Sequence, residues 1–198
     1  MSMLGAPRAR PRPPHRPGRA APEPGLGARD RGLSLLVLGI DPGSTATGYG
    51  LVRGNGAELT AVKFGVIATR ATLPFPQRLR QIFEGLLSLM VAHRPDVAAV
   101  EGVFFARNVR SAIKLGQARG AALLAAAMEG VPVFEYAPRQ VKGAVSGYGG
   151  AEKTQVQAMV RVMLDLPEPP SPADAADALA LAICHHHASR GRGRLIRV

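Results

Sequence analysis

The order of apolar segments along this chain constrains its fold more than any other feature. Five short runs rich in strand-forming residues lie at 33–40, 48–53, 59–68, 97–100 and 131–135. Segments with helical periodicity or composition lie at 73–92, 108–128, 139–145, 152–164 and 173–187. Asn55-Gly56 separates the second and third strands and is a strong hairpin signal. Three consecutive strands followed by alternating helices and strands predict an α/β fold, in which helices flank a mixed five-stranded sheet.

The charge of the chain is concentrated at its two ends. The formal net charge is +11; residues 1–33 carry seven arginines and two acids, and residues 185–198 carry four arginines. We expect a disordered basic Pro/Arg-rich extension at 1–33, one folded domain at 34–187 and a flexible basic tail at 188–198. Basic arms bind polyanions without sequence preference, and a solubilising role for the first arm is the alternative.

The chain contains one cysteine, Cys184, so it cannot form an intramolecular disulfide. This composition fits a reducing compartment, and we expect a cytoplasmic protein. No apolar run approaches the length of a membrane span, and residues 1–33 lack the apolar segment of a secretory signal. The sequence therefore predicts no membrane partner.

Four carboxylates lie at the ends of predicted elements. Asp41 closes the first apolar strand and Glu101 closes the fourth. Asp174 and Asp177 lie three residues apart at the start of the last helix, so both project from one helical face. Carboxylates that follow buried strands meet at the carboxyl edge of a sheet, where open α/β folds build their sites. Because four clustered acids need cations, and their oxygens suit Mg²⁺ or Mn²⁺, a metal-dependent phosphoryl-transfer enzyme is the first hypothesis.

Two of these positions have simpler interpretations. Asp-Pro-Gly at 41–43 is a common turn, although the glycines around it would also leave room for a phosphate backbone. Ser171, Pro172 and Asp174 fit a capping box with Ser171 as the N-cap residue. That box does not explain Asp177, which lies one turn further along the helix.

The segment after the fourth strand combines aromatic with basic residues. It contains Phe104, Phe105, Arg107, Arg110 and Lys114, the last three on one helical face. An exposed aromatic ring stacks on a DNA base while nearby cations hold phosphates. We expect Phe104 to be exposed and Phe105 to be buried; a core position for both is the alternative.

Glycines mark two further regions. Gly116 and Gly120 lie one turn apart in the long helix, where each costs ~1 kcal/mol. We therefore expect close backbone packing there, against the sheet or against the same helix of a second subunit. The glycine-rich loop at 147–151 leads to Lys153, downstream of Lys142, and is either an anion site or an ordinary helix start.

Several of these motifs occur together in one known family. They are GIDPGSTATGYG at 39–50, EGVFFARN at 101–108, SAIKLGQARG at 111–120, VFEYAPRQVK at 133–142, AEKTQVQ at 151–157 and ADAADALA at 173–180. In this order they resemble the RuvC family of bacterial Holliday junction resolvases, which are ribonuclease H-like nucleases. The resemblance covers about 34–187 and leaves the N-terminal extension unexplained.

The resemblance implies a DNA endonuclease that resolves four-way junctions by paired symmetric nicks in recombination and repair. The residues that would bind two Mg²⁺ or Mn²⁺ ions and perform catalysis are Asp41, Glu101, Asp174 and Asp177. The candidate DNA-binding residues are Phe104, Arg107, Arg110, Lys114, Lys142 and Lys153. The implied protein is a homodimer, with Gly116 and Gly120 as candidate interface residues, and works with the branch-migration proteins RuvA and RuvB.

Three other functions are weighed against this interpretation. A related RNA-processing nuclease would share the first motif but not the segments at 104–108 and 115–120 in this form. An actin-like ATPase would need a second phosphate loop and an adenosine motif, which the sequence lacks. A non-catalytic junction-binding protein would be favoured by loss of any of the four acids, and all four are present.

Overall fold

The computed structural model describes residues 34–55, 58–102, 109–190 and 197. The elements are β1 (Leu35–Asp41), β2 (Ala46–Gly54), β3 (Leu59–Ala68), α1 (Phe75–His93), β4 (Val97–Glu101), α2 (Val109–Met128), β5 (Val133–Tyr136), α3 (Pro138–Ser146), α4 (Lys153–Met163) and α5 (Ala173–Arg190). Each begins and ends within two residues of its expected position, except that α5 continues three residues beyond 187. The N-terminal extension and most of the C-terminal tail lie outside the described residues, so their expected disorder stays a prediction.

The five strands form one mixed sheet in the order β3-β2-β1-β4-β5. β1 and β2 pair antiparallel, as do β2 and β3, whereas β1, β4 and β5 run parallel. The register pairs Ile40 with Val100, so that Asp41 and Glu101 follow one residue later on adjacent strands. The predicted α/β class and mixed five-stranded sheet are confirmed, and the first two acids end at one sheet edge.

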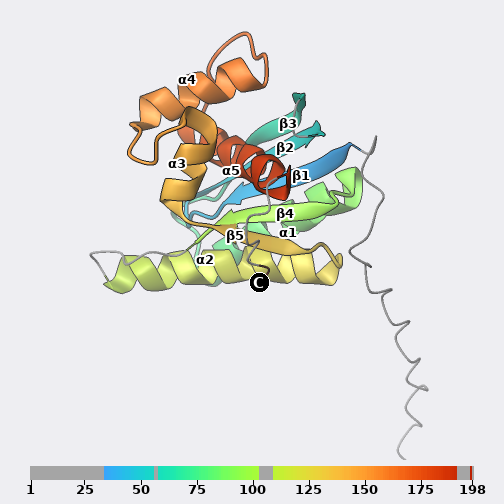
Figure 1. The fold of residues 1–198 in the computed structure, drawn as a ribbon. Helices are drawn as coiled ribbons and strands as arrows, with labels where there is room; N and C mark the ends of the chain where they lie inside the picture. Colours follow the sequence, from blue (N-terminus) through green and yellow to red (C-terminus); the bar gives the residue numbers. More distant parts are fainter. Residues whose placement is uncertain (1–33, 56–57, 103–108, 191–196, 198) are drawn as a thin grey trace, which may run out of the picture. The chain divides into compact units, whose positions relative to one another are not determined.

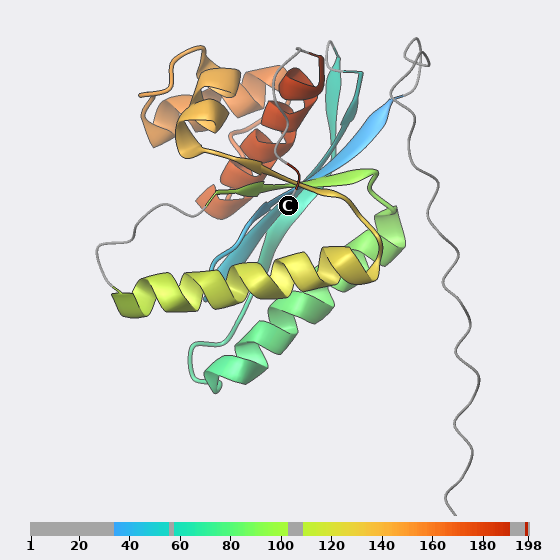
Figure 2. The ribbon, with the colours of Figure 1, turned by 60° about the horizontal axis from the view of Figure 1, so that its bottom comes forward.

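Helices cover both faces of this sheet (Figure 1). α5 packs on β1 and β2, and α3 and α4 pack on α5. α1 and α2 lie together on the opposite face (Figure 2). Successive strand residues point to opposite faces, so β1 contributes Val37 to the core under α5 and Leu38 to the core under α1 and α2.

Glycines allow α5 to lie directly on the sheet. A Cβ atom on Gly39 would overlap the carbonyl oxygen of Ala178, and one on Gly48 would overlap that of Asp174. Backbone therefore meets backbone at both positions, which a residue with a side chain would prevent. The room that these glycines make is filled by α5, and not by the phosphate backbone that the sequence suggested.

The capping box expected at the start of α5 is not formed. The helix begins at Ala173, and the N–H of Ala175 donates to the carbonyl oxygen of Pro172 over 3.0 Å, so Pro172 and not Ser171 precedes it. Within the described ranges, neither Ser171 nor Asp174 makes a side-chain hydrogen bond. The Asp174 carboxylate is therefore available to the site described below.

The second half of α5 carries three consecutive histidines, of which His185 and His186 are buried and His187 is partly buried. His185 Nδ1 lies 2.7 Å from the hydroxyl of Tyr136, and His186 Nε2 lies 3.1 Å from the carbonyl oxygen of Val52. His187 Nδ1 lies 2.9 Å from the carbonyl oxygen of Ala144. The three rings thus turn to three different elements and fix α5 within the core. Among the described residues, none of the helices is both long and apolar enough to cross a membrane.

Candidate active site

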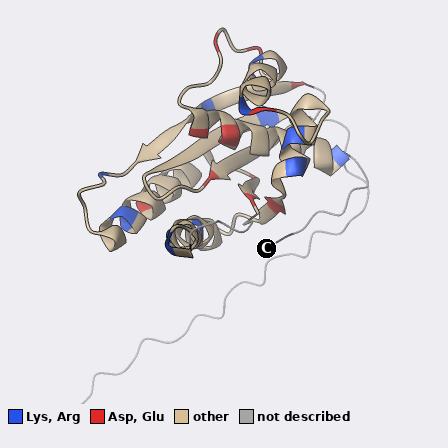
Figure 3. Cartoon of the chain, turned by 90° about the vertical axis from the view of Figure 1, so that its left-hand side faces the viewer, with Lys and Arg blue, Asp and Glu red and all other residues tan. Residues whose placement is uncertain are grey.

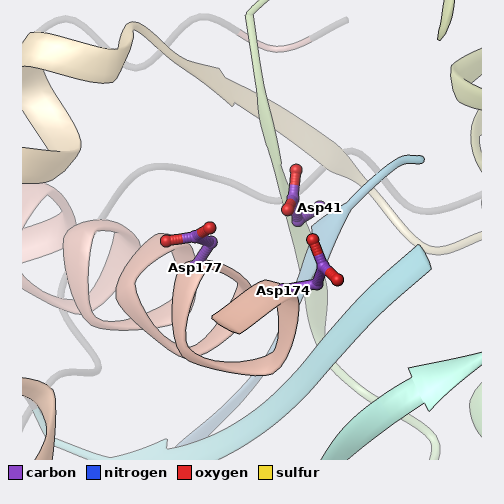
Figure 4. A group of neighbouring side chains, drawn as sticks. All are labelled: Asp41, Asp174 and Asp177. Atoms are coloured by element: carbon purple, nitrogen blue, oxygen red, sulfur yellow. The ribbon is translucent and has the colours of Figure 1, made fainter. Parts of the chain in front are cut away.

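Three carboxylates converge where β1 ends beside the first turns of α5. Asp41 is the last residue of β1, and Asp174 and Asp177 lie one turn apart on α5. One ligand oxygen of each lies within 4.8 Å of the others (Figure 4). The close contact of α5 with Gly48 brings the helix near enough for this convergence. The prediction that these three acids meet is confirmed as geometry.

Glu101 lies beside this group at the end of β4. It lines a cavity of about 250 Å³ together with Asp41, Asp177, Lys142 and Lys153. Burial raises the pKa of the Glu101 carboxyl, and the charge of Asp177 raises it further. Asp41 is therefore within electrostatic reach of the other three acids, and Glu101 is within reach of Asp41 and Asp177.

The acids repel one another strongly enough to change their protonation. The pKa of Asp41 is raised from 3.8 to about 7, mainly by burial and further by the charges of Asp177, Glu101 and Asp174. A desolvated carboxyl among like charges favours its neutral form. A cation bound between these oxygens would remove that penalty.

Lys153 supplies the nearest positive charge of the chain itself. It is the first residue of α4, and its Nζ lies 2.6 Å from Asp177 Oδ2. This contact raises the pKa of the Lys153 ammonium. Because Lys153 is half-exposed, the pair contributes little to stability and the ammonium can exchange partners. The first residue of α4 thus lies against the acids and lines their cavity.

The donor set fits a hard divalent metal ion. Carboxylate oxygens from β1 and α5 converge, Glu101 of β4 lines the same cavity, and oxygen is the ligand atom that Mg²⁺ and Mn²⁺ prefer. Within the described residues, Lys153 and Lys142 are the basic groups that line this cavity. The arrangement is suited to binding metal beside a phosphate group.

The predicted DNA-binding residues fall in two places around the acids. Figure 3 looks toward the carboxyl edge of the sheet and shows basic residues on helices around the central acids. Lys142 and Lys153 line the acidic cavity. Arg110 and Lys114 instead line a groove of about 580 Å³ between α1 and α2. Phe104 and Arg107 lie outside the described residues, as does Phe105.

Gly116 and Gly120 do not pack against the sheet. A Cβ atom on either residue would meet nothing within 4 Å. The prediction that these glycines pack against the sheet is therefore wrong, and packing against a second subunit stays a prediction. Apolar residues share the exposed face of α2 with these glycines: Val109, Ile113, Leu124 and Met128.

Two residues near the site were missed by sequence reasoning. Phe75 begins α1 and makes a cation–π contact with Lys114, whose Nζ lies 5.9 Å from the centroid of the Phe75 ring. Arg119 is buried in α2 and lines a second cavity that also contains Asp41 and Glu101. Nothing in the sequence marks Phe75. Arg119 could have been found, because it is a charged residue on the alanine-rich face of a predicted helix.

Comparison with known proteins identifies the family of the chain. The sequence model described as "Crossover junction endodeoxyribonuclease RuvC" matches residues 37–185. The chain belongs to the RuvC family. RuvC of Brevibacillus brevis is 54% identical over 130 residues, which cover 66% of this chain and 78% of that protein. RuvC of Citrifermentans bemidjiense is 53% identical over 131 residues, covering 66% of this chain and 80% of that protein.

A solved RuvC structure has the same fold. Thermus thermophilus RuvC in complex with a Holliday junction substrate matches with a TM-score of 0.74 and 38% identity, over 82% of this chain and 99% of that one. The resemblance predicted from the motifs and the ribonuclease H-like fold are both confirmed. RuvC membership also favours a DNA junction nuclease over the RNA-processing, ATPase and non-catalytic alternatives.

Proposed function

We propose that this chain resolves four-way DNA junctions by paired symmetric nicks in homologous recombination and DNA repair. The observation that carries the proposal is the convergence of Asp41, Asp174 and Asp177 beside Glu101 at one sheet edge. RuvC relatives are named for endonuclease action at crossover junctions. The acids of this chain provide the chemistry for the same reaction.

Four residues would hold two Mg²⁺ or Mn²⁺ ions: Asp41, Glu101, Asp174 and Asp177. When bound, such ions activate water for attack on the phosphodiester and stabilise the leaving oxygen. Asp41 and Asp177 belong both to the group with Asp174 and to the cavity that Glu101 lines, so both would hold the ions from the centre of the acidic group. Lys142 and Lys153 would hold the strand at the mouth of the cavity, where each can approach a phosphate.

The DNA-binding surface we propose extends beyond the acids. Arg110 and Lys114 would hold a duplex arm in the groove beside Phe75, because both line it. Phe104 and Arg107 stay predictions: the ring would stack on a base near the cut and the guanidinium would bind a phosphate. The basic segments at 1–33 and 188–198 would add attraction for DNA without sequence preference.

The exposed face of α2 supports the proposed homodimer. Val109 is 74% exposed and Ile113 is 57% exposed, which is unusual for large apolar side chains in one row. Gly116 and Gly120 lie in the same row and would let two copies of α2 approach closely. A two-fold axis there would give one active site to each of two opposed strands.

Two further parts of the proposal concern the cell. We place the protein in the cytoplasm, because its proposed substrate is chromosomal DNA and its one cysteine is unpaired. We also propose that it cooperates with RuvA and RuvB, which family membership supports. Co-purification with each protein on a four-way junction would test that cooperation.

The deciding experiment compares cleavage of a mobile four-way junction with that of linear duplex and RNA–DNA hybrid, with Mg²⁺ or Mn²⁺. Wild type should give paired nicks in the junction alone. Asp41→Asn should slow cleavage by more than about 100-fold while junction binding persists. Asp165→Asn is the matched control, since Asp165 is exposed, lies outside the acidic group and has φ 49°, which asparagine tolerates.

Three outcomes would contradict the proposal. Cleavage of the RNA strand in preference to the junction would move the protein to RNA processing. Tight binding to the junction without cleavage in either metal would show that the protein binds junctions but does not cut them. Equal loss of activity in Asp41→Asn and Asp165→Asn would remove the acidic group from the mechanism.

A further inference from the structure

The buried face of α2 contains one residue that its packing does not explain. This face consists of Ala118, Arg119, Ala122, Ala125 and Ala126. The alanines let α2 lie close to its neighbours, whereas Arg119 places a guanidinium in the same layer with 8% of the residue exposed. Arginine is almost never buried without a partner, because removing its charge from water is costly. Its presence therefore needs a ligand or a pairing that uses it.

Arg119 has one ionic partner, which does not use all of its donors. Its Nη2 donates to Glu135 Oε1 on β5. Its Nε is buried and forms no hydrogen bond within the described part of the chain. A guanidinium offers five N–H donors in a rigid plane, so one carboxylate leaves part of the fork unused. A structural ion pair alone would leave that buried donor as an uncompensated loss.

Arg119 also lies beside the acids. Arg119 lines a cavity of about 180 Å³ that also contains Asp41, Pro42, Glu101 and Gly102. Glu135 is paired with Val100, whose side chain belongs to the core under α1 and α2. Arg119 therefore approaches the end of the sheet from the face opposite α5. Asp41 and Glu101 are common to both cavities, and they separate Arg119 from Lys142 and Lys153.

We propose that Arg119 binds a phosphate of the DNA strand next to the phosphate that is cut. This proposal rests on the proposed nuclease function. The cleaved phosphate belongs with the acids and their metal ions, and the strand then continues over the sheet edge into the second cavity. The planar guanidinium fork matches two phosphate oxygens, which a lysine cannot do in the same way. Its positive charge also offsets the repulsion between an incoming phosphate and the carboxylates of Asp41 and Glu101.

The test measures whether the effect of changing Arg119 depends on the charge of one particular phosphate. Junctions are prepared with one neutral methylphosphonate at each position flanking the cut, and wild type is compared with Arg119→Met. Neutralising the contacted phosphate should slow wild-type cleavage and weaken binding by about 10- to 100-fold. Arg119→Met should lose a similar factor on the unmodified junction and be insensitive to that one neutral phosphate, because the two changes remove the same interaction.

Several controls separate this contact from a structural role. Arg119→Lys keeps a cation for Glu135 but loses the fork, and should show partial activity with reduced sensitivity to the same phosphate. If Arg119→Met fails to fold because Glu135 is left buried and unpaired, Arg119→Met/Glu135→Gln removes both charges and takes its place. Arg80→Met removes an exposed arginine that pairs with Glu84 and should behave as wild type at every phosphate.

The outcomes are distinct. Additive effects of Arg119→Met and every neutral phosphate would overturn the proposal and leave Arg119 as the ion-pair partner of Glu135. Sensitivity to one flanking phosphate in wild type, lost in folded Arg119 variants, would support it. Failure of wild type to cut any unmodified junction would instead overturn the proposed nuclease function.

Discussion

The two faces of the sheet are covered in different ways. On one face, α5 touches the strands through backbone atoms at Gly39 and Gly48. On the other, α1 and α2 are held away from the strands by side chains such as Ile82, Leu86 and Met90. The position of α5 on the sheet must be accurate, because α5 carries two of the acids and places them against Asp41. Side chains fill the space on the other face, whose helices carry none of the four acids.

The outer surfaces of the two layers differ as well. α5 is covered by α3 and α4 and keeps most of its residues buried. α2 presents large apolar residues to solvent along its length, including Val109 and Met128. One layer therefore buries its residues around the acids, and the other exposes an apolar face on α2.

The largest effect is expected from filling the backbone contact. Gly39→Ala places a Cβ where the Ala178 carbonyl lies, so α5 must move away from β1. We expect a loss of about 3 kcal/mol in the free energy of unfolding, measured with urea. Gly143→Ala is the control: its Cβ would have ordinary contacts within α3, so it should not destabilise and should gain up to ~1 kcal/mol. Equal effects of both changes would show that α5 does not depend on this contact.

A charge on the exposed face of α2 should act on association. Ile113→Asp replaces a 57%-exposed apolar side chain with a charged one. In a two-fold dimer both subunits would bury this charge in the interface. We expect the dimer dissociation constant to rise about 100-fold, which corresponds to ~2.7 kcal/mol, in analytical ultracentrifugation. Val62→Asp on β3, at 42% exposure, should leave the dimer intact. If both variants dimerise like wild type, the α2 face is not the interface.

The fold and the acids could be predicted because they depend on periodicity and on chain order. A strand ends where its apolar run ends, which fixed Asp41 and Glu101 at one edge without knowledge of their contacts. The glycines of β1 and β2 were assigned the wrong partner, because their sequence does not reveal which surface approaches them. Arg119 was missed for a similar reason: its role depends on β5, which is distant in sequence from the acids.

Protonation of the acidic group should affect stability in the absence of metal. Burial and like charges raise the pKa of Asp41 to about 7, above its unfolded value of 3.8. Protonation therefore favours the folded state, and the free energy of unfolding should fall as pH rises from about 4 to 7. We expect Asp41→Asn to be more stable than wild type by about 1–2 kcal/mol at pH 8 without metal.

Thermal unfolding at several pH values measures this effect, and Mg²⁺ should reverse it by stabilising wild type more than the variant. Asp165→Asn should follow the wild-type curve throughout, because Asp165 is exposed. A wild-type stability that rises between pH 4 and pH 7 would contradict the assigned repulsion.

The smallest effect is expected at Gly116. Within one subunit the added methyl group of Gly116→Ala meets nothing, and alanine is the better helix former by ~1 kcal/mol. The substitution should therefore stabilise a monomeric Ile113→Asp background by roughly that amount. In the dimer the same methyl group should weaken association, so the net gain should vanish. A gain of equal size in both backgrounds would place Gly116 outside the interface.

The buried position of Cys184 makes the chain convenient for site-specific labelling. It is the only cysteine of the chain, and burial raises the pKa of its thiol to about 12. The reactive thiolate is therefore scarce near neutral pH, and reagents have little access to it. A cysteine introduced on the exposed surface of α4 would be the single reactive thiol, so fluorescent or spin probes could report distances between subunits without first removing a native residue.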